Sequence, residues 1–282
     1  RVRKKEIKMK EIYSEITKTM NNLPLSIYLH KQSPCQICAA HWHRALELSI
    51  VFEENVIFFN NGKKRIRYKN SVNLTNCEEI HYSIPQFKRY SDKIVGYTIQ
   101  INYNFLEKMI PNIKNIYFDI DDPNKNKKIT NYMLKIYQEF IDDKFSKNMS
   151  ILMMTLKMLI FLYEECSEER HVGNTLKTKN ILKYINEHYK EELRVYEVAK
   201  YFGYSREYFS RLLKKEIGMS FKEYLTQYRL NKSLNELINI NKNIAEVALN
   251  NGFSNETQYI SIFKKIYNIT PGQYRKSHNN DK

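Results

Sequence analysis

The chain lacks a long hydrophobic run. Its longest apolar stretch, Met149 to Tyr163, covers 15 residues and contains Lys157, whereas a membrane-spanning helix needs about 20 apolar residues. The basic segment at the amino terminus, Arg1 to Lys5, is not followed by the apolar core of a signal peptide. We therefore expect no membrane partner and a cytoplasmic location in contact with the nucleoid.

Glycine and acidic residues are also scarce. The 282 residues include 7 glycines, and 31 Asp and Glu stand against 46 Lys and Arg, which gives a formal net charge of +15. Residues 177–282 hold 19 basic and 11 acidic side chains. This balance favours phosphate contacts, which weaken steeply with salt. Few glycines beside many Asn and Lys also fit the codon usage of an AT-rich genome, so charge alone does not identify the partner.

One pattern occurs twice in the carboxyl-terminal third. The first copy contains Glu197, Val198, Ala199, Gly203, Ser205, Phe209, Leu213, Lys214, Lys215 and Tyr224, and the second contains Glu246, Val247, Ala248, Gly252, Ser254, Tyr259, Phe263, Lys264, Lys265 and Tyr274. The offset is 49 residues before the turn and 50 after it, so the second copy has one extra residue near Glu256.

Each copy has the spacing of a helix-turn-helix. The small Ala allows the second helix to approach closely, and the Gly four residues later suits the left-handed end of the first helix. We expect Ser205 and Ser254 to cap the second helices. The outward, DNA-binding residues are predicted to be Ser205, Arg206, Glu207, Ser210, Arg211 and Lys214 in the first copy, and Asn255, Glu256, Thr257, Gln258, Ser261, Lys264 and Lys265 in the second. A plain helical bundle with solvated basic faces is the alternative, but a repeat with Arg, Asn and Gln facing outward favours base readout.

The segment between the copies reads as one helix from Phe221 to Ile238, because apolar residues recur at helical spacing. A helix of about 18 residues is roughly 27 Å long. It would hold the two recognition helices about one duplex turn, roughly 34 Å, apart on double-stranded DNA.

Residues 178–278 resemble the DNA-binding domain of the AraC/XylS family of bacterial transcription regulators. The resemblance extends through the end of the second copy, where Phe263, Lys264 and Lys265 are followed by Thr270-Pro271 and Tyr274-Arg275. It implies sequence-specific DNA binding, transcription activation with RNA polymerase as a partner, and an amino-terminal sensing domain. Asn268 replaces the usual Gly of the turn and tolerates a left-handed conformation. Ser261 stands where Arg is common, so we expect the first recognition helix to dominate specificity.

The amino-terminal half reads as short strands. They are predicted at residues 45–53, 56–59, 65–68, 71–74 and 94–101, with a hairpin signal at Asn60-Asn61-Gly62. Closely spaced strands predict an antiparallel barrel or jelly roll. Helices are predicted over residues 129–142 and 148–165. Apolar residues lie on nearly all sides of the second, so we expect it to be buried on several faces, either as a core helix or as a subunit interface.

His41, His43 and Glu47 resemble the first cupin motif, and His81 its second histidine. We expect the first three to share one face of a strand. Asn55 stands where that motif usually ends in Gly, and no Pro-x-Gly precedes His81. The four residues are therefore predicted to line the pocket of an unknown small-molecule effector, with no resident cofactor; a metal site is the alternative. Cys35 and Cys38 form a Cys-x-x-Cys pair that suits zinc or redox chemistry, although two plain cytosolic thiols are favoured.

These observations predict an α+β protein: a cupin-like antiparallel β-barrel with linker helices, followed by an all-α double helix-turn-helix domain. The expected boundaries are a basic segment at 1–20, the sensing domain at 21–125, linker and dimerisation helices at 126–170, and the DNA-binding domain at 177–278. The predicted function is an effector-responsive regulator, acting as a homodimer and not an enzyme. The alternatives are a metal-dependent cupin enzyme with an accessory helical domain, and an effector-independent DNA-binding regulator.

Overall fold

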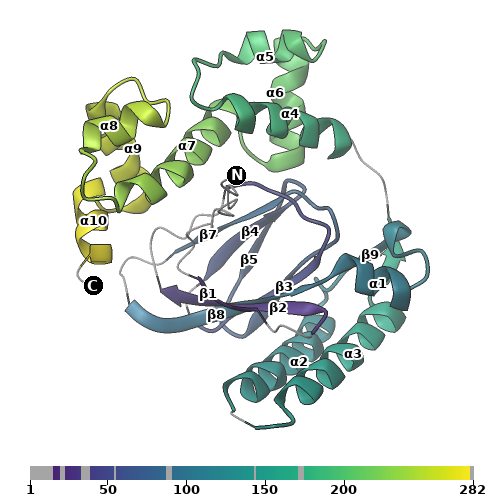
Figure 1. Ribbon diagram of the computed structural model, residues 1–282. Helices are drawn as coiled ribbons and strands as arrows, with labels where there is room; N and C mark the ends of the chain where they lie inside the picture. Colours follow the sequence, from purple (N-terminus) through teal and green to yellow (C-terminus); the bar gives the residue numbers. More distant parts are fainter. Residues whose placement is uncertain are drawn as a thin grey trace, which may run out of the picture.

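The computed structural model describes residues 15–19, 23–32, 39–53, 55–86, 91–142, 144–170 and 175–279. Its amino-terminal half contains two antiparallel sheets (Figure 1). One sheet has the strand order β1-β2-β8-β3-β6 and the other has the order β5-β4-β7. The strands are β1 (Glu15–Thr19), β2 (Leu25–Gln32), β3 (Leu46–Val51), β4 (Val56–Asn60), β5 (Lys63–Arg67), β6 (Ser71–Thr75), β7 (His81–Pro85) and β8 (Ser91–Ile101). With the helical carboxyl-terminal half, this confirms the α+β class. β1 falls within the stretch expected to be only a basic segment.

The β4–β5 hairpin turns at Asn61 and Gly62, as predicted. Both residues have positive φ, 45° and 76°, which matches the right-handed twist of the strands that they join. Three of the four basic side chains of β5 then converge on one carboxylate. Asp121 accepts hydrogen bonds from Lys63 and Arg65 at 2.9 Å and from Arg67 at 2.5 Å, so one carboxylate holds three cationic side chains together.

Helices cover one face of the five-stranded sheet. α1 (Tyr103–Met109), α2 (Pro123–Ile141) and α3 (Lys147–Glu165) contribute to one apolar core with that sheet. A short 3-10 turn (Ile113–Asn115) leads to the small sheet of β9 (Ile116–Phe118) and β10 (Ser167–Glu169). α2 begins earlier than predicted because the Asp122 carboxylate caps it and Pro123 occupies its first turn.

Within one chain α3 is buried on one side only, so it is not a core helix enclosed on several faces, and the subunit-interface alternative stays a prediction. Ile151, Met158 and Leu162 are fully buried, whereas Met149 and Ile160 are 71% and 55% exposed. Met153 and Tyr163 are exposed on the same helix, and Leu134 and Ile141 are exposed on α2. The helix pair therefore presents an apolar outer surface.

The carboxyl-terminal half is helical. Its elements are α4 (Thr175–His188), α5 (Val195–Tyr201), α6 (Arg206–Ile217), α7 (Phe221–Leu237), α8 (Ile244–Asn250), α9 (Glu256–Tyr267) and α10 (Pro271–Asn279). α7 ends one residue before the predicted boundary and lies between the units α5–α6 and α8–α9 (Figure 1). Among the described helices, none combines the length and apolar character that a membrane span requires.

The two halves share an apolar core, which we call the interdomain core. Ala40, Ile80 and Tyr82 of the sheet region pack with buried residues of α4, α6 and α7. Around it, the Lys179 ammonium donates to the Glu78 carboxylate at 3.3 Å. Together these contacts place the three-stranded sheet next to the helical half (Figure 1).

The turn of the β4–β5 hairpin also meets the end of α6. A β-carbon on Gly62 would lie 2.0 Å from the carbonyl oxygen of Lys215. The ring of Phe59 lies 3.0 Å from where a β-carbon would stand on Gly218, which terminates α6 at φ +74°. A close approach of backbone between the halves therefore requires Gly62, whereas Gly218 is required by its left-handed conformation and by the adjacent ring of Phe59.

Candidate functional site

The first repeat folds as a helix-turn-helix. α5 ends at Tyr201, Gly203 in the following turn has a φ of +72°, and the hydroxyl of Ser205 accepts the backbone N–H of Tyr208 at 3.2 Å. Phe209 and Leu213 of α6 are fully buried, as predicted. The left-handed turn residue and the cap that the sequence indicated are both confirmed.

The second repeat follows the same path with one correction. Gly252 and Asn268 have φ values of +81° and +59°, so both predicted left-handed positions are confirmed. The cap of α9, however, is Asn255, whose side-chain oxygen accepts the N–H of Gln258 at 2.8 Å, and not Ser254. The extra residue of this copy lengthens the turn by one position, so Asn255 precedes the helix and does not lie on its outer face.

The residues predicted to contact DNA are exposed in both units. They are Ser205, Arg206, Glu207, Ser210, Arg211 and Lys214 in the first, and Asn255, Glu256, Thr257, Gln258, Ser261, Lys264 and Lys265 in the second. Arg206 and Arg211 make no salt bridge with any residue of the described part of the chain. Their guanidinium groups therefore remain available for acceptors in solution.

The two outer faces differ in what they can offer to bases. The side-chain oxygen of Gln258 accepts from both the N–H and the hydroxyl of Ser254, at 3.2 and 2.8 Å. Bidentate recognition of adenine by Gln requires that oxygen together with the amide nitrogen. Gln258 must break its local contacts before it can read a base in this way, whereas Arg211 need not.

Side-chain contacts fix the two units relative to each other. Arg229 on α7 donates to the carbonyl oxygens of Tyr189 and Glu191, both at 2.7 Å, which holds α7 against the end of α4. About one turn further along α7, the buried hydroxyls of Ser233 and Tyr259 lie 2.9 Å apart, which holds α7 against α9. α7 is therefore a rigid spacer between the outer faces of α6 and α9.

A cavity of about 460 Å³ lies between the two sheets. It is lined by Tyr28, His30, His41, Trp42, His43, Glu47, Ser49, Ile50, Val51, Val56, Phe58, His81, Tyr82, Ser83, Pro85, Val95, Gly96, Thr98 and Gln100. The volume falls within the range of about 300–1,000 Å³ typical of small-molecule sites. One part of its wall is polar and the remainder is aliphatic and aromatic.

Strand register builds the polar part of the cavity. β3 and β8 pair with Glu47 opposite Gln100 and Ser49 opposite Thr98. Because side chains alternate along a strand, these four face the cavity while their neighbours pack under α1 to α3. Gln100 donates to Glu47 at 3.0 Å, and the hydroxyls of Ser49 and Thr98 lie 2.7 Å apart.

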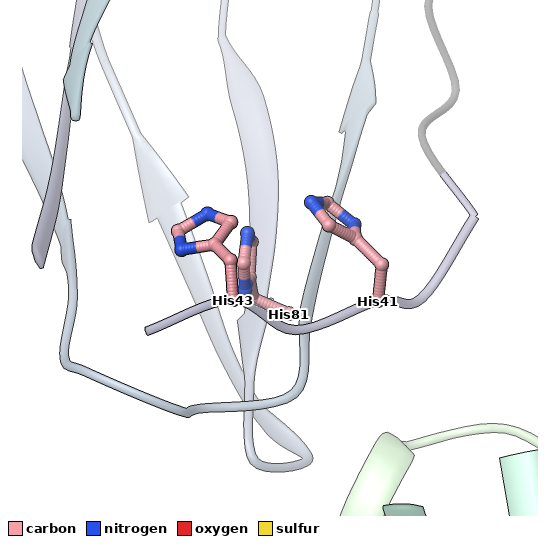
Figure 2. Close-up of side chains that lie close together, drawn as sticks. All are labelled: His41, His43 and His81. Carbon is pink, nitrogen blue, oxygen red and sulfur yellow. The ribbon is translucent and has the colours of Figure 1, made fainter. Parts of the chain in front are cut away.

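Three histidines close this polar part. His41 and His81 exchange backbone hydrogen bonds in an isolated bridge, and their rings lie 4.2 Å apart. The ring of His43 lies 4.8 Å from that of His81 (Figure 2). One ring nitrogen of each histidine lies within 4.8 Å of the other two. His41 and His43 were expected on a strand with Glu47; they lie instead in the segment before β3, and the bridge to His81 brings them together.

The protonation of these side chains is set by their surroundings. Burial lowers the pKa of His81 to about 3, and the charge of His41 acts in the same direction. Burial opposes ionisation of Glu47, but its side-chain contacts with His43 and Gln100 lower its pKa well below the usual range. At neutral pH the site therefore holds a neutral His81 beside an ionised Glu47.

The sequence prediction missed part of this polar wall. Thr98, Ser49 and Gln100 line the cavity, as does His30, whose ring nitrogen lies 2.7 Å from the Thr98 hydroxyl. Burial lowers the pKa of His30 to about 4. Polar residues at alternate positions of the predicted strands 45–53 and 94–101 were the available signal. Cys35 and Cys38 lie outside the described residues, whereas Cys77 and Cys166 are buried free thiols.

Comparison with known proteins agrees with the helical half of this description. Residues 198–277 match the family model of a helix-turn-helix domain. The chain is 24% identical over 229 residues to the HTH-type transcriptional regulator SAR0107 of Staphylococcus aureus, covering 77% of this chain and 31% of that protein. It is 34% identical over 97 residues to the HTH-type transcriptional regulator YtdP of Bacillus subtilis, covering 34% of this chain and 13% of that protein. The chain thus spans about a third of the length of the first of these relatives.

Among solved structures, that of ToxT from Vibrio cholerae aligns over 89% of this chain and 97% of its own, with 13% identity and a TM-score of 0.48. The domain match, the paired helix-turn-helix units and the curated relatives together assign the chain to the AraC family.

Proposed function

We propose that the chain is a sequence-specific DNA-binding transcription regulator whose amino-terminal cavity binds an effector. The observation that carries the DNA-binding part is the pair of helix-turn-helix units on one rigid spacer, each with an exposed polar and basic outer face. The cations near the ends of both recognition helices suit phosphate contacts, which position the protein, and the arginines of α6 suit base contacts, which specify the sequence.

The effector part of the proposal is supported by the position of the cavity. Trp42 and Tyr82 line it and also pack in or against the interdomain core. A ligand that changes the position of either ring therefore changes the packing against α4, α6 and α7. An effector that binds the two interdomain arrangements with different affinity shifts their populations and, through them, the DNA affinity.

The remaining parts of the proposal concern partners. The exposed apolar residues of α2 and α3 suit dimerisation, and a cytoplasmic location with RNA polymerase as a partner follows from the proposed function. The histidine cluster would equally suit a metal-dependent enzyme. The shared core favours regulation, because it connects the cavity to the helix-turn-helix units.

Selection from random duplex DNA with the full chain tests the proposal. We expect enrichment of sites with two contacted segments about one duplex turn apart, and affinity that falls steeply with salt. Arg206→Ala combined with Arg211→Ala should abolish enrichment. The matched control is Lys183→Ala, which removes an exposed cation from α4 and should leave enrichment intact. Binding of all duplexes with equal affinity would contradict the proposal.

A further inference from the structure

The polar part of the cavity has the donor chemistry of a metal centre. The Nδ1 atoms of His41, His43 and His81 lie 3.0, 3.2 and 3.0 Å from the carbonyl oxygens of residues 39, 45 and 79. A carbonyl oxygen only accepts, so each Nδ1 carries the hydrogen. In the neutral imidazole, Nε2 is then the nitrogen with a lone pair, and such fixed tautomers are characteristic of histidines that bind metals.

Two further observations at this cluster favour a bound cation. Nε2 of His81 is buried and has no hydrogen-bond partner in the described structure, since the nearest Glu47 oxygen lies 3.7 Å away. Nε2 of His43 lies 3.0 Å from the Glu47 carboxylate. The Gln100 amide nitrogen lies 3.2 Å from the same Nε2 and donates to the Glu47 carboxylate, so it bridges two groups that a metal ion could bind together.

We propose that His41, His43 and His81, with Glu47, bind a divalent first-row transition-metal ion, and that its binding changes DNA affinity through the interdomain core. Imidazole nitrogen with one carboxylate oxygen suits this class of ion. Nitrogens around a tetrahedral zinc lie about 3.3 Å apart, so modest ring rotations within the observed 4.8 Å limit would complete the site. The proposal rests on the function proposed above and specifies the class of effector.

The route to the helical half is short. Ala40 precedes His41, is buried in the interdomain core, and its carbonyl oxygen accepts from the Tyr224 hydroxyl on α7 at 3.5 Å. Tyr82 follows His81 and stacks on Phe59 with 4.4 Å between ring centroids. A metal ion that draws the two histidines together must therefore move backbone that packs on α6 and α7.

The test uses the full chain, treated with a chelator and then titrated with Zn²⁺ by calorimetry and with Co²⁺ by quenching of Trp42, the single tryptophan. We expect about one ion per chain. His43→Gln and His81→Gln should each weaken binding about 100-fold or more. His188→Gln on α4 and the double change Cys35→Ser with Cys38→Ser are the matched controls and should bind as the parent does.

DNA affinity is then measured with and without Zn²⁺ on a selected duplex. The proposal requires a change of about fivefold or more that disappears in His43→Gln, while circular dichroism and metal-free DNA binding of that variant stay unchanged. No metal binding, binding that survives both histidine substitutions, or binding without effect on DNA affinity would each overturn it. Because DNA binding is measured without metal as well, loss of this inference leaves the proposed function standing. A chain that binds no DNA in either state would instead remove the proposed function.

Discussion

Replacing Gly62 by alanine should separate the two halves of the molecule while leaving both cores intact. The β-carbon would lie 2.0 Å from the Lys215 carbonyl oxygen, and ordinary contact begins at 3.4 Å, so the hairpin and α6 must move apart by about 1.4 Å. The obstructing atom belongs to backbone, so no side-chain rotation relieves the overlap.

The cost of this substitution has two parts. Alanine in a left-handed conformation costs roughly 1–2 kcal/mol, and an overpacked contact adds about 1–3 kcal/mol. Gly203 provides the matched control, because its φ of +72° is nearly that of Gly62 but nothing lies within 4 Å of the β-carbon position. Gly203→Ala should therefore cost only the first part. The difference between the two substitutions measures the contact between the halves.

Trp42 reports which contact is lost. It is half-buried against the interdomain core, so its emission should move to longer wavelength when the halves separate. In Gly62→Ala, the Trp42 emission should change at a lower urea concentration than the helical circular dichroism signal does. In Gly203→Ala the Trp42 transition should stay close to that of the parent. Equal destabilisation by the two substitutions, with no early change in Trp42, would refute the interdomain contact.

Three further predictions concern other parts of the molecule. Arg211→Ala should cost about 1–3 kcal/mol of discrimination between DNA sequences, and Gln258→Ala should cost less. A footprinting comparison in which Gln258→Ala loses more specificity would contradict the expectation that α6 contributes more to specificity than α9. Hydrogen bonds from the basic side chains of β5 outweigh burial and lower the pKa of Asp121. The ionised Asp121 carboxylate should thus stabilise the fold at neutral pH, and this contribution should be lost below about pH 4. Asp121→Asn should therefore cost about 3 kcal/mol of unfolding free energy at pH 7 but little in acid. Urea titrations at the two pH values measure both costs. Met153→Glu with Ile160→Glu should turn a dimer into a folded monomer in sedimentation experiments, whereas Lys183→Glu on α4, outside this helix pair, should not.

Local patterns were sufficient to predict the helical half. The left-handed positions at Gly203 and Gly252, the buried face of α6 and the extent of α7 depend on residues near in sequence, where spacing determines the conformation. The cap of α9 was missed for a local reason too. Both Ser254 and Asn255 are good caps, and the single inserted residue decides between them.

The cavity depends on pairing that no one-dimensional pattern specifies. The resemblance to cupin motifs grouped the histidines with Glu47, but Thr98 and Gln100 join them because β3 and β8 pair in one register; a shift by one residue would turn both into the apolar core. The contact that requires Gly62 could not be predicted from the sequence either, because it also depends on tertiary structure. Its sequence context predicts a hairpin turn, whereas the approach of Lys215 comes from a chain segment about 150 residues away.

The shared core makes the coupling reciprocal. If a metal ion at the histidine cluster changes DNA affinity by some factor, a selected duplex must change metal affinity by the same factor, because both belong to one thermodynamic cycle. Calorimetric titration with Zn²⁺ in saturating DNA measures that factor independently. Gly62→Ala should reduce both factors together toward one, since it separates the hairpin from α6 without altering any proposed metal ligand. A loss of one factor without the other would show that the signal reaches the helix-turn-helix units by a route other than the interdomain core.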